Sequence, residues 1–474
     1  MANVNGDLIP ERVGYVTDIE GNIEFFNEYV RRSPILSYDS QQNLQLADKS
    51  AFVFGGDLFD RGPGDIRLSR VLVDLKKKYP TRVFLLIGNR DSNKLRFAAE
   101  LSDKEMERPI NEVPAIGIVN CDISPEVYFH ENGLEDSKTN RLKWILHKTM
   151  NSPNAFEFRR QELSILLGRE NINDLEVTNS FIESVQPPHG FVFEYLENAQ
   201  LAVAIGDTLF IHGGIDEKAC LFVPDVKKLS YFDRNTGDPA IDESDDIPGY
   251  YMNHTTSVHE WIDKLNEFVV DSIQDYCSAP FWTEEGQRGG EALMAYQCER
   301  ATQGRTVVFI SAFSSGNVAP ISEEAQSYLI SNGIQRVVVG HRPVGDSPLI
   351  VRQGAQIERV FADLSYSNPQ AEDFRGGAVT ELIIDFQNSG PTSSLHIHGI
   401  LKDGHEYDFD VAPMNVSRSE NSNGEGEEGK ETDCIGYQTK DGFWIKVKMP
   451  DGKFRVAKTV GFNVTYELRD AGEL

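Results

Sequence analysis

The sequence predicts an α/β fold built around a parallel or mixed β-sheet. The first hundred residues contain three units that each read as an apolar strand, a polar turn and a helix, with the strands at 12–17, 52–54 and 83–87. Strands that alternate with helices imply right-handed βαβ crossovers, which place successive strands in one sheet. Further apolar runs that end in polar turns return after residue 200, so a second group of strands is expected there.

Polar side chains follow each of the first three strands at the point where the strand ends. The first turn leads into a helix over 23–30, where apolar residues recur at helical spacing. The three turns supply Asp18, Glu20, Asp57, Asp60, Arg61, Asn89, Arg90 and Asp91. Ligands bind at the carboxyl ends of strands in open α/β sheets. Carboxylates, an amide and guanidiniums that meet at this edge therefore predict a metal and phosphate site.

Two long stretches interrupt the strand pattern and predict insertions. Residues 101–190 hold amphipathic segments broken by prolines, which is typical of helices, and residues 215–305 hold further helical segments. Between the insertions, the runs 201–205 and 208–211 are joined by Gly-Asp, which predicts a hairpin. The second of these strands runs directly into His212.

The second half of the chain adds more strands and an extension. Strands are expected at 306–310, 335–339, 359–362, 378–386 and 394–401, with a helix at 322–331. The strand at 335–339 ends in a turn that carries His341 and Arg342. We expect one domain over 10–403, an acidic flexible linker at 417–433 and a C-terminal β-hairpin over 434–474, because the linker is poor in apolar residues and the tail alternates.

Composition excludes several classes of protein. The chain has 474 residues and a net charge of −28, which argues against nucleic-acid binding because that affinity comes from basic residues. No apolar run reaches the roughly 20 residues that a membrane-spanning helix needs. The N-terminus lacks a basic start followed by an apolar segment. Five scattered cysteines, none in a C-x-x-C pair, indicate reduced thiols, so a cytoplasmic location is expected.

The polar turns together assemble a set of oxygen and imidazole donors. The candidate metal ligands are Asp18, Glu20, Asp57, Asn89, His212 and His341. This mixture suits Mn, Fe, Zn or Mg better than thiolate-preferring metals. A central aspartate could bridge two ions, as in phosphoesterases that use two metals. One or two divalent ions are therefore expected as cofactors.

Several motifs in the same order resemble the calcineurin-like metallophosphoesterase superfamily. G-D-L-F-D-R-G at 56–62, K-Y-P-x-x-x-F-L-L-x-G-N at 78–89 and I-H-G-G at 211–214 are similar to its serine/threonine protein phosphatase branch. G-H-R-P at 340–343 is similar to its diadenosine tetraphosphate hydrolase branch. The resemblance covers residues 13 to about 363 apart from the insertions, and it implies two β-sheets packed face to face and flanked by helices.

The resemblance also implies roles for individual residues. Asp57 would bridge two metal ions and Asp18 would belong to the first ion, while the second ion would also be held by Asn89, His212 and His341. Arg61 and Arg342 would hold substrate phosphate, since a guanidinium offers two parallel donors to phosphate oxygens. Arg61 could instead brace the loop at Asp60.

Two departures from the family pattern bear on the chemistry. The family's D-x-H is Asp18-Ile19-Glu20 here, and its G-N-H-D/E is Gly88-Asn89-Arg90-Asp91. The first change replaces a metal-ligating histidine with a carboxylate, and the second replaces the usual general acid. Arg90 offsets the added charge of Glu20, but arginine cannot donate a proton usefully. Loss of leaving-group protonation, worth ~10²–10⁴-fold, would be least harmful for phosphoanhydrides and aryl phosphates.

The expected function is metal-dependent hydrolysis of phosphoesters or phosphoanhydrides, with a metal-bound hydroxide attacking phosphorus in line. Its expected catalytic residues are Arg61, Arg90, Asp91 and Arg342. Its substrate would be a phosphorylated small molecule, a dinucleoside polyphosphate or a phosphoprotein. The alternative is that Glu20 and Arg90 pair and occupy the space of the first ion. The protein would then hold one ion or none, and could be a degenerate phosphatase that acts by binding a ligand or partner.

Overall fold

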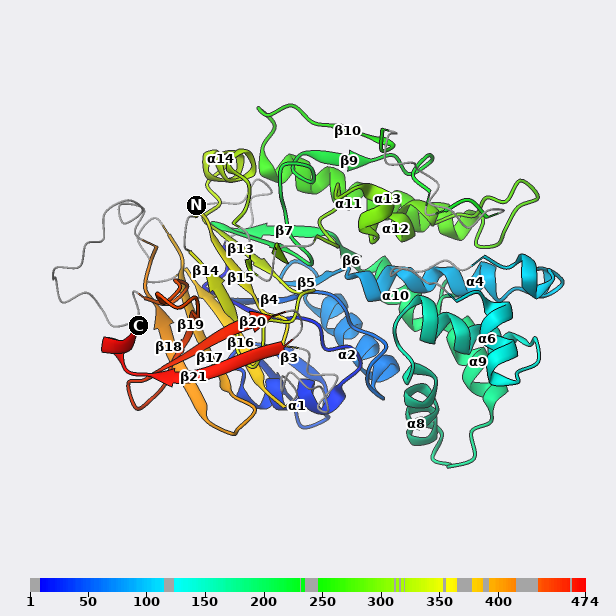
Figure 1. Ribbon diagram of the computed structural model, residues 1–474, viewed down its shortest axis with the longest axis horizontal. Coiled ribbons are helices and arrows are strands. Elements are labelled where there is room, and N and C mark those ends of the chain that lie inside the picture. The colour runs from blue at the N-terminus through cyan, green and yellow to red at the C-terminus, as the bar shows by residue number, and fades with distance from the viewer. Residues whose placement is uncertain are drawn as a thin grey trace.

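The computed structural model of the chain is centred on two β-sheets packed face to face, with helices on their outer faces (Figure 1). It describes residues 9–114, 123–230, 232–234, 246–310, 313–314, 317–318, 320–352, 355–364, 377–386, 392–414, 434–460 and 463–474. The predicted linker at 417–433 lies outside the described residues. The two-sheet α/β architecture that the resemblance implied is confirmed.

The larger sheet has seven strands in the order β18-β17-β16-β1-β4-β5-β6. These strands are β1 (Arg12–Val16), β4 (Ser50–Phe54), β5 (Val83–Leu86), β6 (Ala199–Gln200), β16 (Val379–Asp385), β17 (Ser394–Ile400) and β18 (Glu406–Val411). β1, β4, β5 and β6 are parallel, whereas β16 to β18 run antiparallel. The mixed sheet is therefore as predicted, and its parallel half presents three polar turns at one edge.

The smaller sheet has five strands in the order β14-β15-β13-β8-β7. They are β7 (Ala202–Ile205), β8 (Thr208–Ile211), β13 (Arg336–Val339), β14 (Leu349–Val351) and β15 (Glu358–Phe361). β7 and β8 form the predicted antiparallel hairpin, while β8, β13 and β15 are parallel. The turns after β8 and β13 consequently face the same edge as those of the larger sheet.

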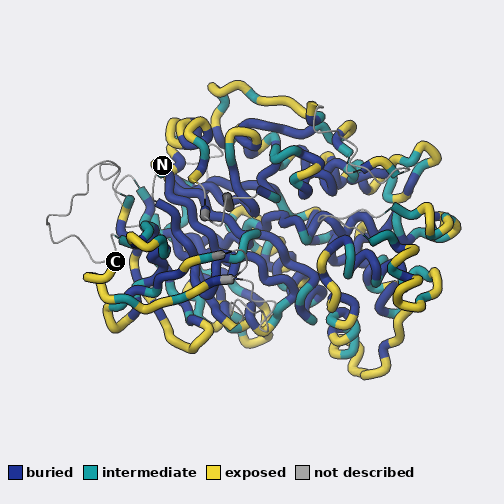
Figure 2. The backbone as a smooth tube through the Cα atoms, viewed as in Figure 1, coloured by how far each residue is buried: buried dark blue, intermediate teal, exposed yellow. Residues whose placement is uncertain are grey.

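Alternation of apolar residues explains how the sheets pack. Tyr15, Val53, Phe210 and Val360 are buried in a core that holds residues of both sheets, while their chain neighbours pack outward against helices. Figure 2 shows this interior as buried and places the exposed residues at the periphery. Period-2 patterning thus determines which side chains lie between the sheets.

Helices cover the outer faces and fill the insertions. α1 (Ile23–Arg32), α2 (Asp65–Lys78) and α14 (Glu323–Ser331) belong to the sheet region. Residues 89–197 hold short and long helices, α3 (Asn89–Ser92), α4 (Arg96–Glu100), α5 (Asp103–Met106), α6 (Pro125–Asn132), α7 (Lys138–Trp144), η3 (Ile145–Thr149), α8 (Ala155–Leu167), α9 (Asp174–Ser184) and α10 (Phe191–Glu197). Most of these lie to one side of the sheets, in cyan and teal in Figure 1.

The second insertion lies above the smaller sheet in the same view. It contains β9 (Phe222–Pro224), β10 (Gly249–Tyr251), α11 (Val258–Ser278), α12 (Glu291–Tyr296) and α13 (Glu299–Thr302). α11 contacts β7 and β9. Among the described residues, no helix combines the length and the apolar character needed to cross a bilayer. The domain boundaries drawn from the sequence stay predictions.

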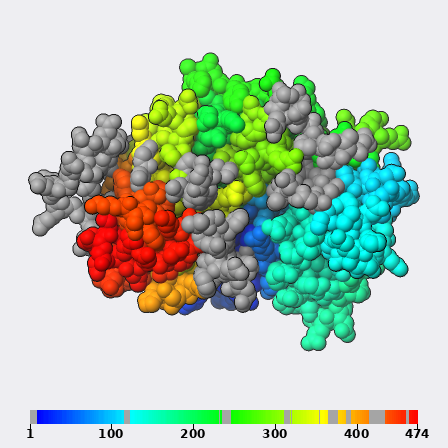
Figure 3. Space-filling view, viewed as in Figure 1, coloured from blue at the N-terminus to red at the C-terminus, as the bar shows by residue number. Residues whose placement is uncertain are grey.

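The structure differs from the sequence expectations in two details. Residues 306–310 are not a strand: the carbonyl of Val307 instead accepts the N–H groups of Gly213 and Gly214, at 2.8 and 3.2 Å. The C-terminal tail contains the expected hairpin, formed by β19 (Trp444–Lys448) and β20 (Phe454–Val460), and a third strand, β21 (Asn463–Arg469), pairs with β20. Apolar residues predicted strands in both segments. Whether an apolar run becomes a strand also depends on a neighbouring strand with which it can pair. Figure 3 shows the C-terminal sheet in red on the face toward the viewer.

A buried charge cluster connects the two sheets. Glu358 on β15 accepts a hydrogen bond from Arg336 at 2.6 Å and pairs through its other oxygen with Arg352. Arg336 also donates to Ser393, beside β17, and Arg352 donates to the carbonyl of Ala412, after β18. The cluster therefore fixes the smaller sheet to the antiparallel half of the larger one.

Glu358→Gln tests this connection. The substitution leaves two buried guanidiniums without a charged partner, so we expect the free energy of unfolding to fall by about 3–5 kcal/mol and the midpoint of thermal unfolding to fall with it. Glu406→Gln is the control, because Glu406 is an exposed partner of Arg32 and such pairs contribute at most about 1 kcal/mol. Equal midpoints for E358Q and E406Q would contradict the assignment.

Candidate metal and phosphate site

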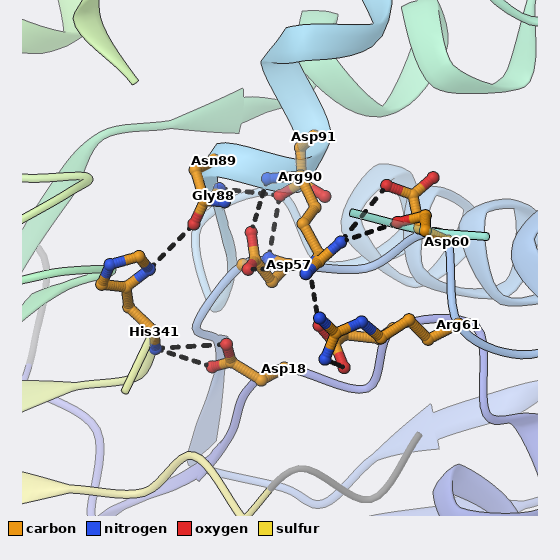
Figure 4. A network of polar contacts seen from close by, with 12 residues as sticks. Asp18, Asp57, Asp60, Arg61, Gly88, Asn89, Arg90, Asp91 and His341 are labelled. Carbon is orange, nitrogen blue, oxygen red and sulfur yellow. Dashed lines mark hydrogen bonds and ion pairs between the residues drawn. The ribbon is translucent and has the colours of Figure 1, made fainter. Parts of the chain in front are cut away.

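The candidate site lies at the shared edge where parallel strands of both sheets end (Figure 4). β1 leads to Asp18 and Glu20, and β4 leads to Asp57. The turn after β5 supplies Asn89, Arg90 and Asp91, whereas His212 follows β8 and His341 follows β13. The structure thus brings residues from five strand ends into one neighbourhood, and their chemical roles stay predictions.

Asp57, His212 and His341 form the candidate metal-ligand group among the described residues. One ligand atom of each lies within 4.8 Å of the others. His212 Nδ1 is 2.8 Å from the carbonyl oxygen of Gly55, to which it can donate, and Nε2 lies 3.4 Å from Asp57 Oδ1. A donor bond from one ring nitrogen fixes the tautomer and leaves the other nitrogen free to ligate.

His341 and Asn89 complete this side of the site. His341 Nδ1 lies 2.8 Å from Asn89 Oδ1, which is also 3.4 Å from His212 Nε2. His341 Nε2 is buried and has no hydrogen-bond partner. An orphaned buried ring nitrogen is costly in the absence of a ligand. A carboxylate, an amide oxygen and two imidazoles fit Mn, Fe or Zn, so these residues suit a divalent ion.

The electrostatics of this group favour a bound cation. Burial disfavours the charged form of His212, but attraction to Asp57 outweighs burial and raises the His212 pKa to about 10. For Asp57 burial also opposes ionisation, and His212 and Arg90 nevertheless lower its pKa. Burial, followed by repulsion from His212, lowers the pKa of His341. A metal ion would replace the proton on His212, as ligation requires neutral imidazole.

The guanidinium of Arg90 lies among three carboxylates on the opposite side of Asp57. Its Nε is 2.6 Å from Glu20 Oε1 and 3.8 Å from Asp57 Oδ2, and its Nη1 is 3.7 Å from Asp60 Oδ2. Nη1 also donates to Ser152 Oγ at 2.9 Å. Burial opposes the charge, yet Glu20 and Asp57 raise the pKa of Arg90 further. Arg90 therefore remains a cation and cannot serve as a general acid.

The pairing of Glu20 with Arg90 is the arrangement that the sequence left open as an alternative. Arg61 adds a second cation, with Nη1 3.6 Å from Glu20 Oε2. Glu20 therefore already has two cationic neighbours on the side that the resemblance assigns to the first ion. These residues fit a second divalent ion less well than Asp57, His212 and His341 fit one.

Asp18 and Asp91 have most of their oxygens engaged by the protein. Asp18 accepts from Thr17 Oγ at 2.5 Å, and both of its oxygens lie 3.1 Å from the backbone nitrogen of His341. Asp91 accepts three backbone N–H groups, from Asp57, Leu58 and Gly88, at 3.0, 2.8 and 2.7 Å. The contacts of Asp91 support a positioning role within the predicted catalytic set, because they bind the Asp57 turn to the Asn89 turn.

Strained backbone concentrates at these turns. Asp18, Glu20, Asp57 and His341 have φ angles of 52°, 48°, 53° and 66°, in the left-handed region that non-glycine residues rarely adopt. Gly88 permits the close approach of Asp57, since a Cβ there would lie 2.2 Å from Asp57 Oδ1. Such strain persists only where surrounding contacts impose it, and it is typical of functional sites.

The two remaining arginines flank the site. Arg61 is 30% exposed beside Glu20. Arg342 packs with its guanidinium carbon 5.6 Å from the ring centroid of Phe309, whose ring centroid lies 4.3 Å from that of His341. Both guanidiniums are therefore close to the candidate ligands, as phosphate-binding groups would need to be.

Sequence reasoning missed two residues that hold Arg90. Lys94 is 1% exposed, and its Nζ lies 2.9 Å from Asp60 Oδ1 and donates to the carbonyl of Arg90. Ser152 comes from the first insertion. Nothing in the sequence distinguishes a buried lysine from the exposed lysines that are far commoner. The position of Ser152 depends on how the insertion packs, which local patterns do not reveal.

The solved structures that resemble the chain include two phosphatases of low sequence identity. A cold-active protein-tyrosine phosphatase of a psychrophilic Shewanella species has 14% identity and a TM-score of 0.41, over 84% of this chain and 80% of that chain. A protein serine/threonine phosphatase from Saccharomyces cerevisiae has 13% identity and a TM-score of 0.34, over 85% and 84% of the two chains. No curated protein matches the chain.

The family comparison is more decisive. The family model for calcineurin-like phosphoesterases matches residues 11–345, which is more than half of the chain and includes every strand end described above. The chain belongs to the calcineurin-like phosphoesterase family.

Proposed function

We propose that this protein hydrolyses phosphoesters or phosphoanhydrides with one divalent metal ion. The observation that carries the proposal is the convergence of Asp57, His212 and His341 at the shared strand edge, where their ligand atoms lie within 4.8 Å of one another. Family membership supports a phosphoester hydrolase in general. A divalent ion held by these residues and Asn89 would supply Lewis-acid activation of the phosphoryl group and of the attacking water.

Arg90 supplies a permanent positive charge beside Asp57. Because it is buried and held by Glu20, Asp57 and Asp60, its guanidinium is preorganised and does not reorient during the reaction. Preorganised charge that faces the developing negative charge of a phosphoryl transition state is among the largest contributions to catalysis. Arg61 and Arg342 would add further donors to the phosphate oxygens.

The absence of a histidine at the position of Arg90 limits the substrates. A leaving oxygen that receives no proton departs as an anion, so its own pKa determines how fast it leaves. Phosphoanhydrides and aryl phosphates are therefore better candidates than alkyl phosphomonoesters. Among the phosphorylated compounds that the sequence suggested, this favours a dinucleoside polyphosphate or another phosphorylated small molecule over a phosphoserine protein.

The alternative function, a degenerate phosphatase that acts by binding a partner, is less well supported. The Glu20 and Arg90 pair on which it rests is present, but the ligands of one ion remain converged on the other side of Asp57. Manganese as the ion and a cytoplasmic location also belong to the proposal. A panel of aryl phosphates, dinucleoside polyphosphates and phosphopeptides, each with Mn, Mg, Fe or Zn, tests the activity directly.

Asp57→Asn should abolish hydrolysis in that panel. The substitution removes a carboxylate that both the metal group and Arg90 contact, and we expect a loss on the order of 100-fold or more in kcat. Asp271→Asn is the control, since Asp271 is exposed on α11 and lies outside the turns that form the site. Full activity of D57N would contradict the proposed site.

The metal content of the purified protein distinguishes a site for one ion from a site for two. Protein purified without chelator should contain one divalent ion per chain by elemental analysis, and His341→Ala should lose it. Arg90→Ala removes the cation that pairs with Glu20, so its content should rise toward two ions per chain. Arg61→Ala removes the more exposed partner of the same carboxylate and should stay at one. Two ions in the wild type would refute the one-ion proposal.

The dependence of rate on the leaving group tests the loss of the general acid. For a series of substituted phenyl phosphates, kcat/KM should fall steeply as the pKa of the phenol rises, because no side chain protonates the leaving oxygen. Arg90→His places a proton donor at this position and should make the dependence shallower. A shallow dependence in the wild type would show that another group donates the proton.

A further inference from the structure

Arg359 is a buried arginine that the proposed mechanism does not use. Its side chain starts on β15 and is 4% exposed, and neither Nε nor Nη2 has a hydrogen-bond partner. Its carbon Cζ lies 4.7 Å from the ring centroid of Phe361. Burying a charge without a partner costs several kcal/mol. A guanidinium in this state therefore points to an anion that is not part of the chain.

The guanidinium of Arg359 lies against the turn that carries the metal ligand His212. A Cβ built on Gly214 would be 2.3 Å from Arg359 Nη2, so the close approach depends on glycine at this position. The same turn is fixed from the other direction, because Gly213 and Gly214 donate to the carbonyl of Val307. Arg359 therefore lies against Gly214, which is two residues after His212. Arg359 and His212 are 147 positions apart in the sequence.

A second guanidinium with an unpaired nitrogen lies near the same segment. Arg342 packs over Phe309, and its Nε is buried without a partner. Arg359 lies beside Gly214, whose built Cβ would also contact Ile310 at 3.6 Å. The two arginines therefore flank residues 307–310, next to the turns of His212 and His341.

Acidic groups nearby do not neutralise these cations. The carboxylates that attract these cations are Asp216 for Arg359, and Glu299 followed by Asp363 for Arg342. Asp216 uses Oδ1 to accept the N–H groups of Lys218 and Ala219. Among the described residues, no ion pair within 4 Å joins either arginine to an acid. Unpaired donor capacity consequently remains on both guanidiniums.

We propose that Arg342 and Arg359 form a second oxyanion subsite, which receives the phosphate next to the one that is attacked. This inference rests on the proposed hydrolase function and narrows its substrates to compounds with two or more linked phosphates. In the reaction, water oxygen bonds to the attacked phosphorus and the bridging P–O bond breaks, with its electron pair going to the leaving phosphate. The proton from water passes to solvent or to the phosphate products.

The subsite and the missing general acid support each other. A leaving phosphate needs no proton when cations neutralise its charge, and Arg342 and Arg359 are placed to do so. A simple phosphomonoester would leave the guanidinium of Arg359 unpaired. The subsite therefore accounts for a buried cation that a monoesterase would not need.

Binding of inorganic tripolyphosphate tests the subsite without requiring turnover. Isothermal titration of protein freed of metal should show at least tenfold tighter binding of tripolyphosphate than of orthophosphate, and Arg359→Met should remove that difference. Arg305→Met is the matched control. This substitution also removes one positive charge, but the guanidinium of Arg305 already donates to the hydroxyl of Tyr251. Equal binding of the two anions by the wild type, or an R359M protein with unchanged preference, would overturn the proposal.

Stability and kinetics distinguish the subsite from a structural role and from failure of the proposed function. Without anion, the thermal midpoint of R359M should equal or exceed that of the wild type, since an unpaired buried charge is removed, and tripolyphosphate should raise only the wild-type midpoint. In turnover, R359M should lower kcat/KM for pyrophosphate at least tenfold more than for p-nitrophenyl phosphate. If no substrate is hydrolysed, the hydrolase function fails while the binding result still decides the subsite.

If R359M fails to fold, a second variant tests the subsite. Arg359→Lys retains the charge but loses the planar fork that binds two oxygens. A loss of threefold or more in tripolyphosphate affinity would support the subsite. Unchanged affinity in R359K, together with a lower thermal midpoint in R359M, would assign Arg359 to structure alone.

Discussion

The site depends on one buried ion pair, between Arg90 and Glu20. Glu20, Asp57 and Asp60 are brought together at low exposure, where like charges repel strongly because little water screens them. Arg90 reaches all three, and Lys94 fixes both Asp60 and the backbone of Arg90. Removing the cation would leave buried carboxylates unpaired, which costs more than the pair itself contributes. Glu20 and Arg90 therefore belong to one arrangement, in which a side chain supplies positive charge on one side of Asp57 and the proposed metal ion would supply it on the other.

That arrangement requires turns with backbone conformations that residues other than glycine rarely adopt. Left-handed conformations at Asp18, Glu20 and Asp57 each carry a cost of about 1–3 kcal/mol, which surrounding contacts must offset. Asp91 provides the clearest offset, because its carboxylate binds three amides across two turns. Its burial, followed by repulsion from Asp57, raises the Asp91 pKa to about 7, so this carboxylate loses its negative charge as the pH falls through neutrality.

Local patterns predicted the strands and the turns well, because an apolar run that ends in glycine and a carboxylate is visible without knowledge of the fold. They also raised the pairing of Glu20 with Arg90, since two departures from one motif compensated in charge. They did not predict Lys94, Ser152 or Arg359, whose importance arises from burial. The strand predicted at 306–310 is absent, and a third C-terminal strand is present that was not predicted, for the same reason: each depends on the partner that the tertiary fold supplies.

The C-terminal sheet shows how far that tertiary dependence extends. The loop after His341 and Arg342 is held by residues more than a hundred positions later: Lys446 donates to the carbonyl of Val344 at 2.6 Å, and Asp346 contacts Arg455 and the hydroxyl of Tyr466. At its start the same loop is held by Asp18, which accepts the backbone N–H of His341. A loop restrained at both ends keeps its imidazole and guanidinium in one orientation. The extension is therefore part of what positions the site, although it carries none of the family's motifs.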